Sequence, residues 1–342
     1  MSRRVPSCIA AVLLLGGFLL GGFGGLSACR SRASAYTVSY LDTFDTVLTV
    51  TVGATSHTEA STHTSAIHEI IKALHVRFDI HAPHEGVSGL YALNHAEGKS
   101  VTIDRDTMDI LLMGKDFYMR TEGKLNLCLG SATILWHEAR QTGILPDGKA
   151  LAEALTHIDP AALVLNETDM TATLTDPATK VDVGTLAKGY AMMKVCEYAE
   201  EAGLGSLLVN LGGHILALGR HPDGNPWTVS IQSPGGGSLT TVEVENATLS
   251  TAGDYERAFT VNGTSYHHII DPSTGYPSSA HRAATVVLPV DRTHVMEADA
   301  LATSLFLLPR QEGEDLLSGH FHARALWVNT DGTVETTANW GS

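Results

Sequence analysis

Five short segments in the C-terminal half of the chain carry residues that could handle a phosphorylated ligand. They are VDVGTLAKGY (181–190), LLVNLGGHILALG (207–219), STAGDYERAF (250–259), YHHIIDPSTGYP (266–277) and EADALATSLF (297–306). Each sets one or two Lys, His or Asp residues among glycines or at the start of an expected helix. Phosphate groups bind to such positive charges and free backbone amides. The sequence therefore indicates an enzyme of phosphate and metal chemistry.

The first segment would present phosphate-binding groups at a helix start. Strand-like residues lead to Asp182, and a helix is expected over 185–202, ended by Gly203. First-turn amides have no partners within a helix and lie at the positive end of its dipole, where Lys188 would add a charge. The Walker A spacing is absent, because Lys188 precedes its glycine. The structural alternative is that Asp182 caps the helix and Lys188 lies on the surface.

Asp299 and Thr303 have the spacing of a metal site on a helix, here expected over about 294–308. Residues four apart lie on one helix face, so both oxygens would point the same way. Such hard oxygen ligands suit Mg²⁺, which takes its other ligands from water and substrate phosphates. Alone, this pattern is more often a solvent-exposed acid.

His267 and His268 supply a titratable group before the DPSTG turn. On a strand their side chains would alternate, so only one could enter a given site. A neutral His is a suitable general base, and the rate should rise with pH through the ordinary His range. A lone His in a strand is more often structural. The other histidines lack HExxH or similar spacing, so no zinc site is predicted. NLGGH (210–214) lacks GxGxxG, which favours a tight turn over a dinucleotide-binding Rossmann site.

The elements that must position these residues are mostly hairpins. Strands are expected over 37–52, and helices over 62–78 and about 106–123. From residue 161 onward short strands follow one another, with turns at Asn262-Gly263 and Asp331-Gly332. Few βαβ units occur, so an α+β fold with mainly antiparallel sheets is predicted.

Composition narrows the class of protein. The chain has 342 residues, 44% of them hydrophobic, which is enough for one large core. A formal net charge of −15 argues against unspecific binding to nucleic acid. Outside the N-terminal segment only Cys128 and Cys196 remain, too few for a disulfide framework or a Cys-based zinc site, so both are predicted to be buried thiols.

The N-terminus has the pattern of an export signal. Arg3 and Arg4 precede an apolar, Gly-rich stretch, and LSAC (26–29) resembles the bacterial lipobox, whose Cys is diacylated. This predicts a signal peptide over 1–28, a lipid on Cys29, a polar tether over 29–36 and a catalytic domain over 37–342. The domain would lie on the periplasmic side of the bacterial inner membrane. The alternative is an uncleaved membrane helix, since the stretch is long enough to span.

Together these segments resemble the ApbE-type FAD:protein FMN transferases, extracytoplasmic bacterial enzymes that are often lipoproteins. The resemblance runs from FDT (44–46) through GKLNLCLGSATILW (123–136) to DALAT (299–303). It implies a catalytic unit of two subdomains, with FAD as substrate and Mg²⁺ as metal. The acceptor would be a Thr or Ser hydroxyl of a target flavoprotein, which attacks the FMN-side phosphorus of FAD and expels AMP.

The resemblance also implies residue roles. The metal would be held by the Asp299 carboxylate, the Thr303 hydroxyl and the Thr185 carbonyl. His268 matches an FAD-contacting histidine of the family and is the predicted base. The other residues expected to contact FAD are Phe44, His81, Lys124, Leu125, Asn126, Asp182 and Lys188.

Three positions depart from the family's pattern. FDT stands where Met-Gly-Thr is common, His81 where Tyr is usual and Asn126 where Asp is more frequent. Two alternative functions follow: hydrolysis of FAD to FMN and AMP with water as acceptor, or a non-catalytic FAD-binding lipoprotein. Retention of Asp299, Thr303, Lys188 and His268 favours an enzyme.

Overall fold

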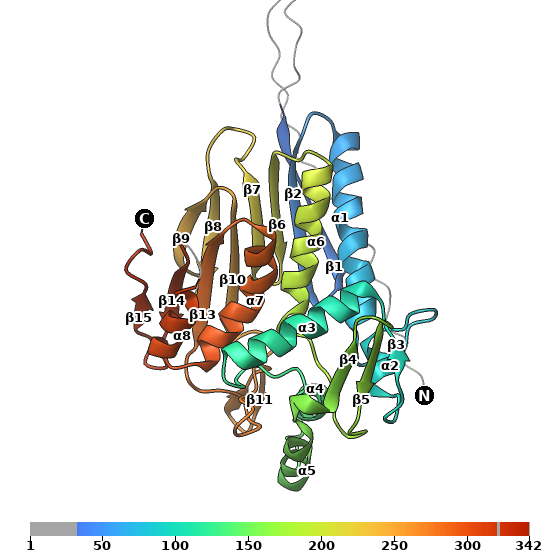
Figure 1. Ribbon diagram of the computed structural model, residues 1–342. Coiled ribbons are helices and arrows are strands. Elements are labelled where there is room, and N and C mark those ends of the chain that lie inside the picture. Colours follow the sequence, from blue (N-terminus) through green and yellow to red (C-terminus); the bar gives the residue numbers. More distant parts are fainter. Residues whose placement is uncertain (1–32, 320–321, 342) are drawn as a thin grey trace, which may run out of the picture. The chain divides into compact units, whose positions relative to one another are not determined.

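An antiparallel sheet of eight strands is the main element of this computed structural model, which describes residues 33–319 and 322–341 (Figure 1). The expected signal segment and Cys29 lie outside the described residues. In sheet order the strands are β1 (Ser34–Thr43), β2 (Thr46–Ala54), β6 (Ser206–Leu211), β7 (His214–Gly219), β10 (Ala247–Gly253), β13 (Ala283–Pro289), β14 (Arg324–Val328) and β15 (Val334–Thr336). Every neighbouring pair is antiparallel, and the predicted α+β class is confirmed.

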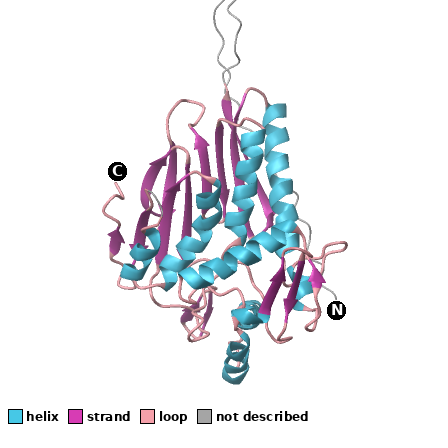
Figure 2. Cartoon of the chain, in the orientation of Figure 1, coloured by secondary structure: helices cyan, strands magenta, loops and turns pink. Residues whose placement is uncertain are grey.

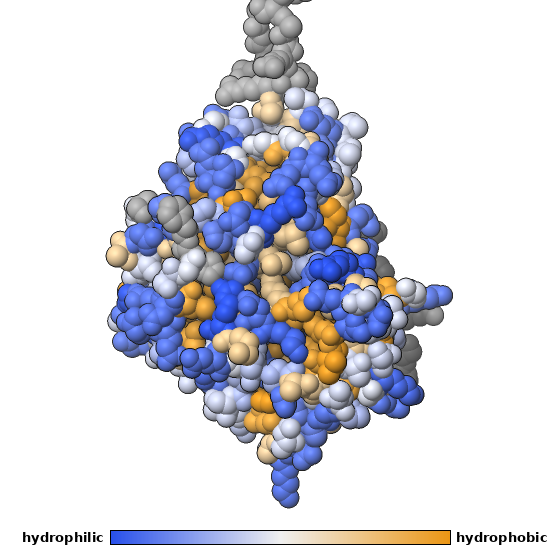
Figure 3. Space-filling view, in the orientation of Figure 1, coloured by the Kyte–Doolittle hydropathy of each residue, from blue (hydrophilic) through white to orange (hydrophobic). Residues whose placement is uncertain are grey.

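Three helices cover one face of this sheet: α1 (His57–Phe78), α6 (Ala187–Glu201) and α7 (Arg292–Leu307), which lie in front of the strands in Figure 2. Alternate residues of β2 point toward them, and Leu48, Val50 and Val52 are fully buried. The face seen in Figure 3 is mostly hydrophilic, with several apolar patches. Removal of apolar surface from water stabilises this layer.

The opposite face of the sheet carries a separate hairpin, β8 (Trp227–Gln232) and β9 (Ser238–Val244). A second apolar cluster forms there, in which Trp227 and Val229 of the hairpin pack on Ile215, Leu249 and Val287 of the sheet. The sheet is therefore buried on both faces around β7, β10 and β13.

The smaller elements of the fold lie around one end of the main sheet (Figure 1). They are α2 (Leu90–Asn94), α3 (Arg105–Arg120), α4 (Gly130–Thr142), α5 (Gly148–Ala154), the small sheet of β3 (Val101–Thr102), β5 (Thr171–Leu174) and β4 (Leu163–Asn166), the hairpin of β11 (Phe259–Val261) and β12 (Thr264–Tyr266), and α8 (Arg310–Leu317). Two 3₁₀ turns follow α5, at Leu155–His157 and Pro160–Ala162. No helix within the described ranges is long and apolar enough to cross a membrane.

Several element boundaries differ from the sequence predictions. β1 begins at Ser34, so residues 34–36 belong to a strand and not to the expected tether; Tyr36 packs against the core there. α1 begins at His57, not at 62, because Ser56 caps it by accepting from the Glu59 amide. α3 ends at Arg120, and α6 begins two residues later than predicted. β10 and α4 were not predicted at all.

Other predictions are confirmed. Residues 210–214 form a tight turn between β6 and β7, with Gly212 and Gly213 at φ values of +53° and +85°. A Cβ on Gly212 would lie 2.5 Å from Thr46 Oγ1, so the turn brings the backbone against a neighbouring strand. Cys128 and Cys196 are buried free thiols, and burial raises the pKa of Cys128 to about 12.

Candidate active site

A cavity of about 600 Å³ opens at the end of the main sheet, and every predicted site residue within the described ranges lines it. These residues are Phe44, His81, Lys124, Leu125, Asn126, Asp182, Thr185, Lys188, His268, Asp299 and Thr303. They come from the β1–β2 turn, the loop after α1, the segment after α3, the segment that leads into α6 and its first turn, the loop after β12, and α7. The fold therefore gathers the predicted residues, while the role of each stays a prediction.

The Asp299 carboxylate is the most deeply buried acid of the cavity, at 4% exposed. Its Oδ1 lies 3.1 Å from Lys188 Nζ and accepts from Ser250 Oγ at 3.3 Å. Its Oδ2 is buried and has no hydrogen-bond partner among the residues that the structure describes. Thr303, one turn along α7, is 6% exposed. The interpretation of Asp299 as a solvent-exposed acid is therefore wrong.

Helices α6 and α7 pack closely enough for Lys188 to form an ion pair with Asp299. Gly189 of α6 faces α7, where a Cβ would overlap the Met296 carbonyl oxygen and lie 3.3 Å from Asp299 Cβ. Only glycine lets the helices approach this far. The lysine side chain consequently points inward, and its surface alternative is wrong as well.

Asp182 does not cap α6. Its Oδ1 accepts from the Gly184 amide at 2.8 Å, and its Oδ2 accepts from Thr133 Oγ1 at 2.7 Å, which ties the segment to α4. The N-cap of α6 is Leu186, which makes no side-chain capping bond. No side chain caps the first turn, although the Ala187 amide donates to the Val183 carbonyl at 2.9 Å. The positive end of the helix dipole still faces the cavity at Lys188.

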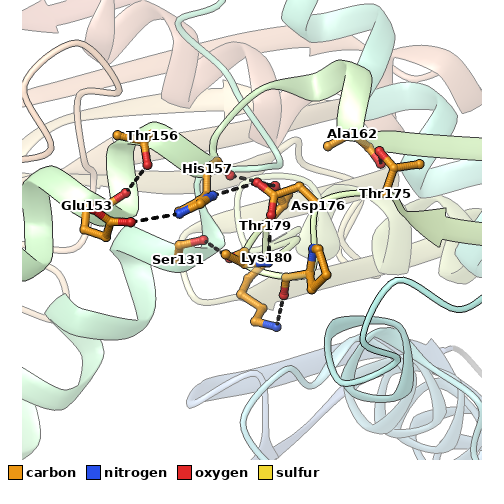
Figure 4. Close-up of polar contacts among 11 residues, drawn as sticks. Ser131, Glu153, Thr156, His157, Ala162, Thr175, Asp176, Thr179 and Lys180 are labelled. Carbon is orange, nitrogen blue, oxygen red and sulfur yellow. Dashed lines mark hydrogen bonds and ion pairs between the residues drawn. The ribbon is translucent and has the colours of Figure 1, made fainter.

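A polar network outside the cavity holds the segment that leads to Asp182 (Figure 4). His157 bonds to Asp176 at 2.6 Å, and Thr179 Oγ1 donates to the His157 carbonyl at 2.9 Å. Ser131 Oγ donates to the Ala178 carbonyl at 2.9 Å. The hydrogen bond that Asp176 accepts from His157 raises the pKa of His157. These contacts join the 3₁₀ turn after α5, the start of α4 and residues 176–179, and so fix the approach to the site.

The two adjacent histidines have different surroundings, although neither lies in a strand, since β12 ends at Tyr266. His267 donates from Nε2 to the Ser278 carbonyl at 2.8 Å and accepts at Nδ1 from the Ile269 amide at 3.2 Å. Both of its nitrogens therefore serve the backbone. His268 donates from Nδ1 to the Glu256 carbonyl at 3.0 Å, which leaves the Nε2 lone pair for the cavity. The expected alternation along a strand is thus wrong, but the choice of His268 stands on its bonds.

His268 is exposed to the cavity, and desolvation by the cavity walls, followed by nearby positive charges, favours its neutral form. Enclosure by the cavity walls and the nearby Arg257 and Lys188 hold the pKa of His268 well below its ordinary value. Burial raises the pKa of Glu256, whose side chain also lines the cavity, against the charges of Lys188 and Arg257. The centre of the cavity thus combines a neutral base with a lysine and two acids.

Phe44 stands in a tight turn at the mouth of the cavity. Phe44 and Asp45 have positive φ angles of 49° and 51°, which cost a non-glycine residue about 1–2 kcal/mol each. The backbone is held on both sides: the Phe44 amide donates to His75 Nδ1 at 3.2 Å, and Arg257 Nη2 donates to its carbonyl at 2.8 Å.

Two of the remaining residues predicted to contact FAD, Asn126 and Lys124, already use their polar side chains in bonds within the protein. Asn126 Nδ2 donates to the Ile158 carbonyl at 2.8 Å, and its Oδ1 accepts from the Cys128 amide at 2.9 Å. An Asp could not donate to Ile158, which explains the amide at this position. Lys124 Nζ is paired with Asp271 at 3.2 Å.

Leu125 and His81 contribute an apolar side chain and a flat ring to the cavity wall. Leu125 is 2% exposed, and its amide donates to Thr121 Oγ1 at 2.9 Å. His81 instead stacks on His137 with ring centroids 3.8 Å apart, and so provides a flat surface at the cavity wall.

Sequence reasoning missed an aromatic and cationic wall. Trp136 of α4 and Phe259 of β11 line the cavity, and Trp136 Nε1 donates to the Gly275 carbonyl at 2.7 Å. Arg140 and Arg257 add two guanidinium groups. The quoted segments STAGDYERAF and GKLNLCLGSATILW held three of these four residues, so the available signal was their place in those motifs. Planar groups and cations of this kind suit an aromatic ring system with attached phosphates.

The metal-binding potential of the cavity lies in oxygen atoms. Within residues 33–319 and 322–341, no three His, Cys, Asp or Glu side chains are grouped so that they could hold a metal ion. Asp299, Thr303 and the Thr185 backbone would offer one carboxylate, one hydroxyl and one carbonyl. Such a sparse oxygen set fits a hard cation that keeps part of its water.

Comparison with known proteins agrees with this geometry. The model of the ApbE family matches residues 44–327. A Treponema pallidum protein named FAD:protein FMN transferase is 30% identical over 331 residues, covering 92% of this chain and 90% of that protein. A Klebsiella pneumoniae protein of the same name is 29% identical over 265 residues, or 75% of this chain and 78% of that protein.

Solved structures share the fold. The crystal structure of the ApbE protein of Thermotoga maritima has a TM-score of 0.80 at 25% identity and covers 90% of this chain and 98% of that one. The flavin transferase ApbE of Vibrio cholerae has a TM-score of 0.76 at 23% identity, with 90% and 98% coverage. With the family match over most of its length, the chain belongs to the ApbE family.

Proposed function

We propose that this protein is an FAD:protein FMN transferase that uses Mg²⁺ and releases AMP. The names of its relatives support the transferase class. The buried Asp299 carboxylate, with one oxygen paired to Lys188 and the other unpaired within the described residues, supports the phosphate chemistry most directly. Lys188 compensates the charge of the buried carboxylate only in part, because the second oxygen can still accept a donor or a cation.

The residues present fit Mg²⁺. Asp299 Oδ2, the Thr303 hydroxyl and the Thr185 carbonyl would hold it, because all three residues line the same cavity and the carboxylate oxygen has no other partner in the described part of the chain. When bound, Mg²⁺ would supply positive charge that offsets the charge developing on the phosphates. The chain's own contribution there is Lys188, together with the positive end of the α6 dipole.

In the proposed transfer step, His268 acts as the base that accepts the proton of the acceptor hydroxyl. The oxygen of the acceptor's Thr or Ser hydroxyl forms a bond to the FMN-side phosphorus of FAD. The bond from that phosphorus to the bridging oxygen breaks, and AMP leaves with the electron pair. The hydroxyl proton passes to Nε2 of His268, which carries the lone pair because Nδ1 donates to the Glu256 carbonyl.

The decisive experiment compares acceptors. Purified protein is incubated with FAD and Mg²⁺, with and without a flavoprotein that carries the acceptor hydroxyl, and the products are identified by mass spectrometry. We expect covalent FMN on the acceptor and AMP in solution. FMN and AMP formed equally without acceptor would indicate FAD hydrolysis, and FAD bound but unchanged would indicate a carrier. Either outcome refutes the transferase proposal.

We further propose that Cys29 carries a lipid that holds the protein at the inner membrane, facing the periplasm. The LSAC sequence and the polar residues after it support this proposal, and two acyl chains suffice for stable anchoring. In Cys29→Ser cells, labelled fatty acid should be absent from the protein. Unchanged labelling and membrane retention would refute the proposal.

A further inference from the structure

His214 is a buried histidine whose hydrogen bonds define which nitrogen carries the proton. It begins β7 and is fully buried. Its Nε2 lies 3.1 Å from Thr248 Oγ1, and that hydroxyl donates its own proton to the Ile215 carbonyl at 3.1 Å. The Thr248 oxygen must therefore accept from His214. Nε2 carries the proton, and Nδ1 holds a lone pair.

That lone pair has no donor. His214 Nδ1 is buried without a hydrogen-bond partner among the described residues, as is Asp299 Oδ2. An unpaired buried acceptor costs about 1–3 kcal/mol, so such atoms are rare in folded proteins. Two acceptors in this state, one of them in the proposed cation site, indicate a shared donor.

The sheet register brings the two groups to the same place. His214 is the antiparallel partner of Ser250 in β10, so their side chains lie on one face of the sheet. Ser250 Oγ donates to Asp299 Oδ1 at 3.3 Å. The charges of Asp299 and Lys188 both act on the imidazole, although burial is the larger effect and lowers the pKa of His214 to about 4. His214 therefore lies beside the carboxylate as a neutral acceptor.

We propose that His214 is a positioning residue of the cation site, whose Nδ1 accepts a hydrogen bond from a water molecule coordinated to the divalent cation at Asp299. This inference rests on the proposed function. Mg²⁺ keeps several of its waters when it binds to proteins, and those waters are strong donors. A neutral imidazole fixed by Thr248 would orient one of them from behind the carboxylate, as outer-shell partners do in other metal sites.

Binding of Mn²⁺, a paramagnetic substitute for Mg²⁺, tests the proposal without turnover. Free Mn²⁺ is measured by electron paramagnetic resonance during titration of the full-length protein. His214→Leu keeps a similar apolar shape but removes the acceptor, and should weaken Mn²⁺ binding about 10- to 100-fold. His214→Asn places an amide oxygen near the position of Nδ1, and should stay within about threefold of the wild type.

Two controls separate the possible outcomes. Thr107→Val removes another buried hydroxyl without a partner in the described structure. Unlike His214, Thr107 is not paired with Ser250, the residue that bonds to Asp299, so Mn²⁺ binding should be unchanged. Asp299→Asn should abolish binding. Two results would refute the role of His214 and leave the proposed function standing. In the first, Asp299→Asn abolishes Mn²⁺ binding but His214→Leu binds Mn²⁺ like the wild type. In the second, Mn²⁺ binding is weakened equally in His214→Leu and His214→Asn.

A failure of the cation site itself would look different. Absence of Mn²⁺ binding in the wild-type protein would refute both the metal part of the proposed function and the role of His214. If His214→Leu does not fold, nitrogen NMR of the wild type still decides. The Nδ1 resonance that is missing from the His214→Asn spectrum should shift on addition of Mg²⁺, and no shift would refute the inference.

Discussion

Replacement of His268 by Asn removes the proposed base while retaining its anchor. The Asn amide can still donate to the Glu256 carbonyl, which His268 Nδ1 contacts at 3.0 Å, but nothing replaces the Nε2 lone pair. A positioned base contributes about 10²- to 10⁴-fold in rate, or about 2.7–5.4 kcal/mol at 1.36 kcal/mol per tenfold change. FMN transfer should slow by that factor, while FAD binding, measured by flavin fluorescence, should change much less.

The pH profile gives a second, independent readout. The base is active when neutral, so the rate rises with pH through the pKa of His268. Enclosure, Arg257 and Lys188 place that pKa well below the ordinary His value. We therefore expect kcat/KM, which reports free enzyme and free substrate, to show no His268 step between about pH 6 and 8. This differs from the sequence-based expectation of a rise through the ordinary His range, and the measured profile distinguishes the two.

His267 serves as the matched control, because it bonds only to backbone groups. His267→Asn leaves the buried Ser278 carbonyl without its donor, which should lower the free energy of unfolding by about 1–3 kcal/mol. The kcat/KM of the folded fraction should not change. Transfer by His268→Asn at the wild-type rate would refute the base assignment, and Asp182 would then be the next candidate.

Three further perturbations follow from the geometry. Asp299→Asn should slow FAD cleavage at least about 100-fold, because the cation's charge stabilisation amounts to several kcal/mol, and Mg²⁺ should no longer raise Tm; a retained Mg²⁺ response would contradict the site. Gly189→Ala drives a Cβ into the Met296 carbonyl and should cost about 1–3 kcal/mol in urea unfolding, whereas Gly148→Ala, in open space, should cost nothing. Burial lowers the pKa of His214 to about 4, below its unfolded value near 6.5, so metal-free protein should lose about 3 kcal/mol as pH falls between these values. His214→Asn should lose less over the same range, and parallel urea-unfolding curves against pH would rule this contribution out.

The sequence predicts those cavity residues that are charged or polar and have helical spacing. Asp299, Thr303 and Lys188 stand at helix positions whose direction follows from the 3.6-residue period. The choice of His268 over His267 was also predictable, but only from its match to the family. The reason for that choice lies in the Glu256 carbonyl, twelve residues earlier along the chain. Bonds of this kind leave no periodic trace in the sequence.

Two of the elements that escaped prediction, β10 and α4, have residues that line or support the site. β10 reads ATLSTAG, a run of small and polar residues that lacks strand alternation because both of its faces are buried and one supports Asp299 through Ser250. α4 begins without a side-chain cap, so its start has no signal. The turn at Phe44 and Asp45 uses positive φ angles without glycine, and its supports, His75 and Arg257, are remote in sequence.

The pairing of β2 with β6 has a consequence for the newly made chain. Residues 48–52 pair with 207–211, and the cavity takes its walls from Phe44 as well as from α7. A ribosome must therefore add some 250 residues after Phe44 before the last wall exists, and closure of such long loops delays folding further. Fragments that end before α7 lack the carboxylate altogether. We therefore expect nascent chains and fragments that end before α7 to be inactive, and the site to form only late in synthesis and folding.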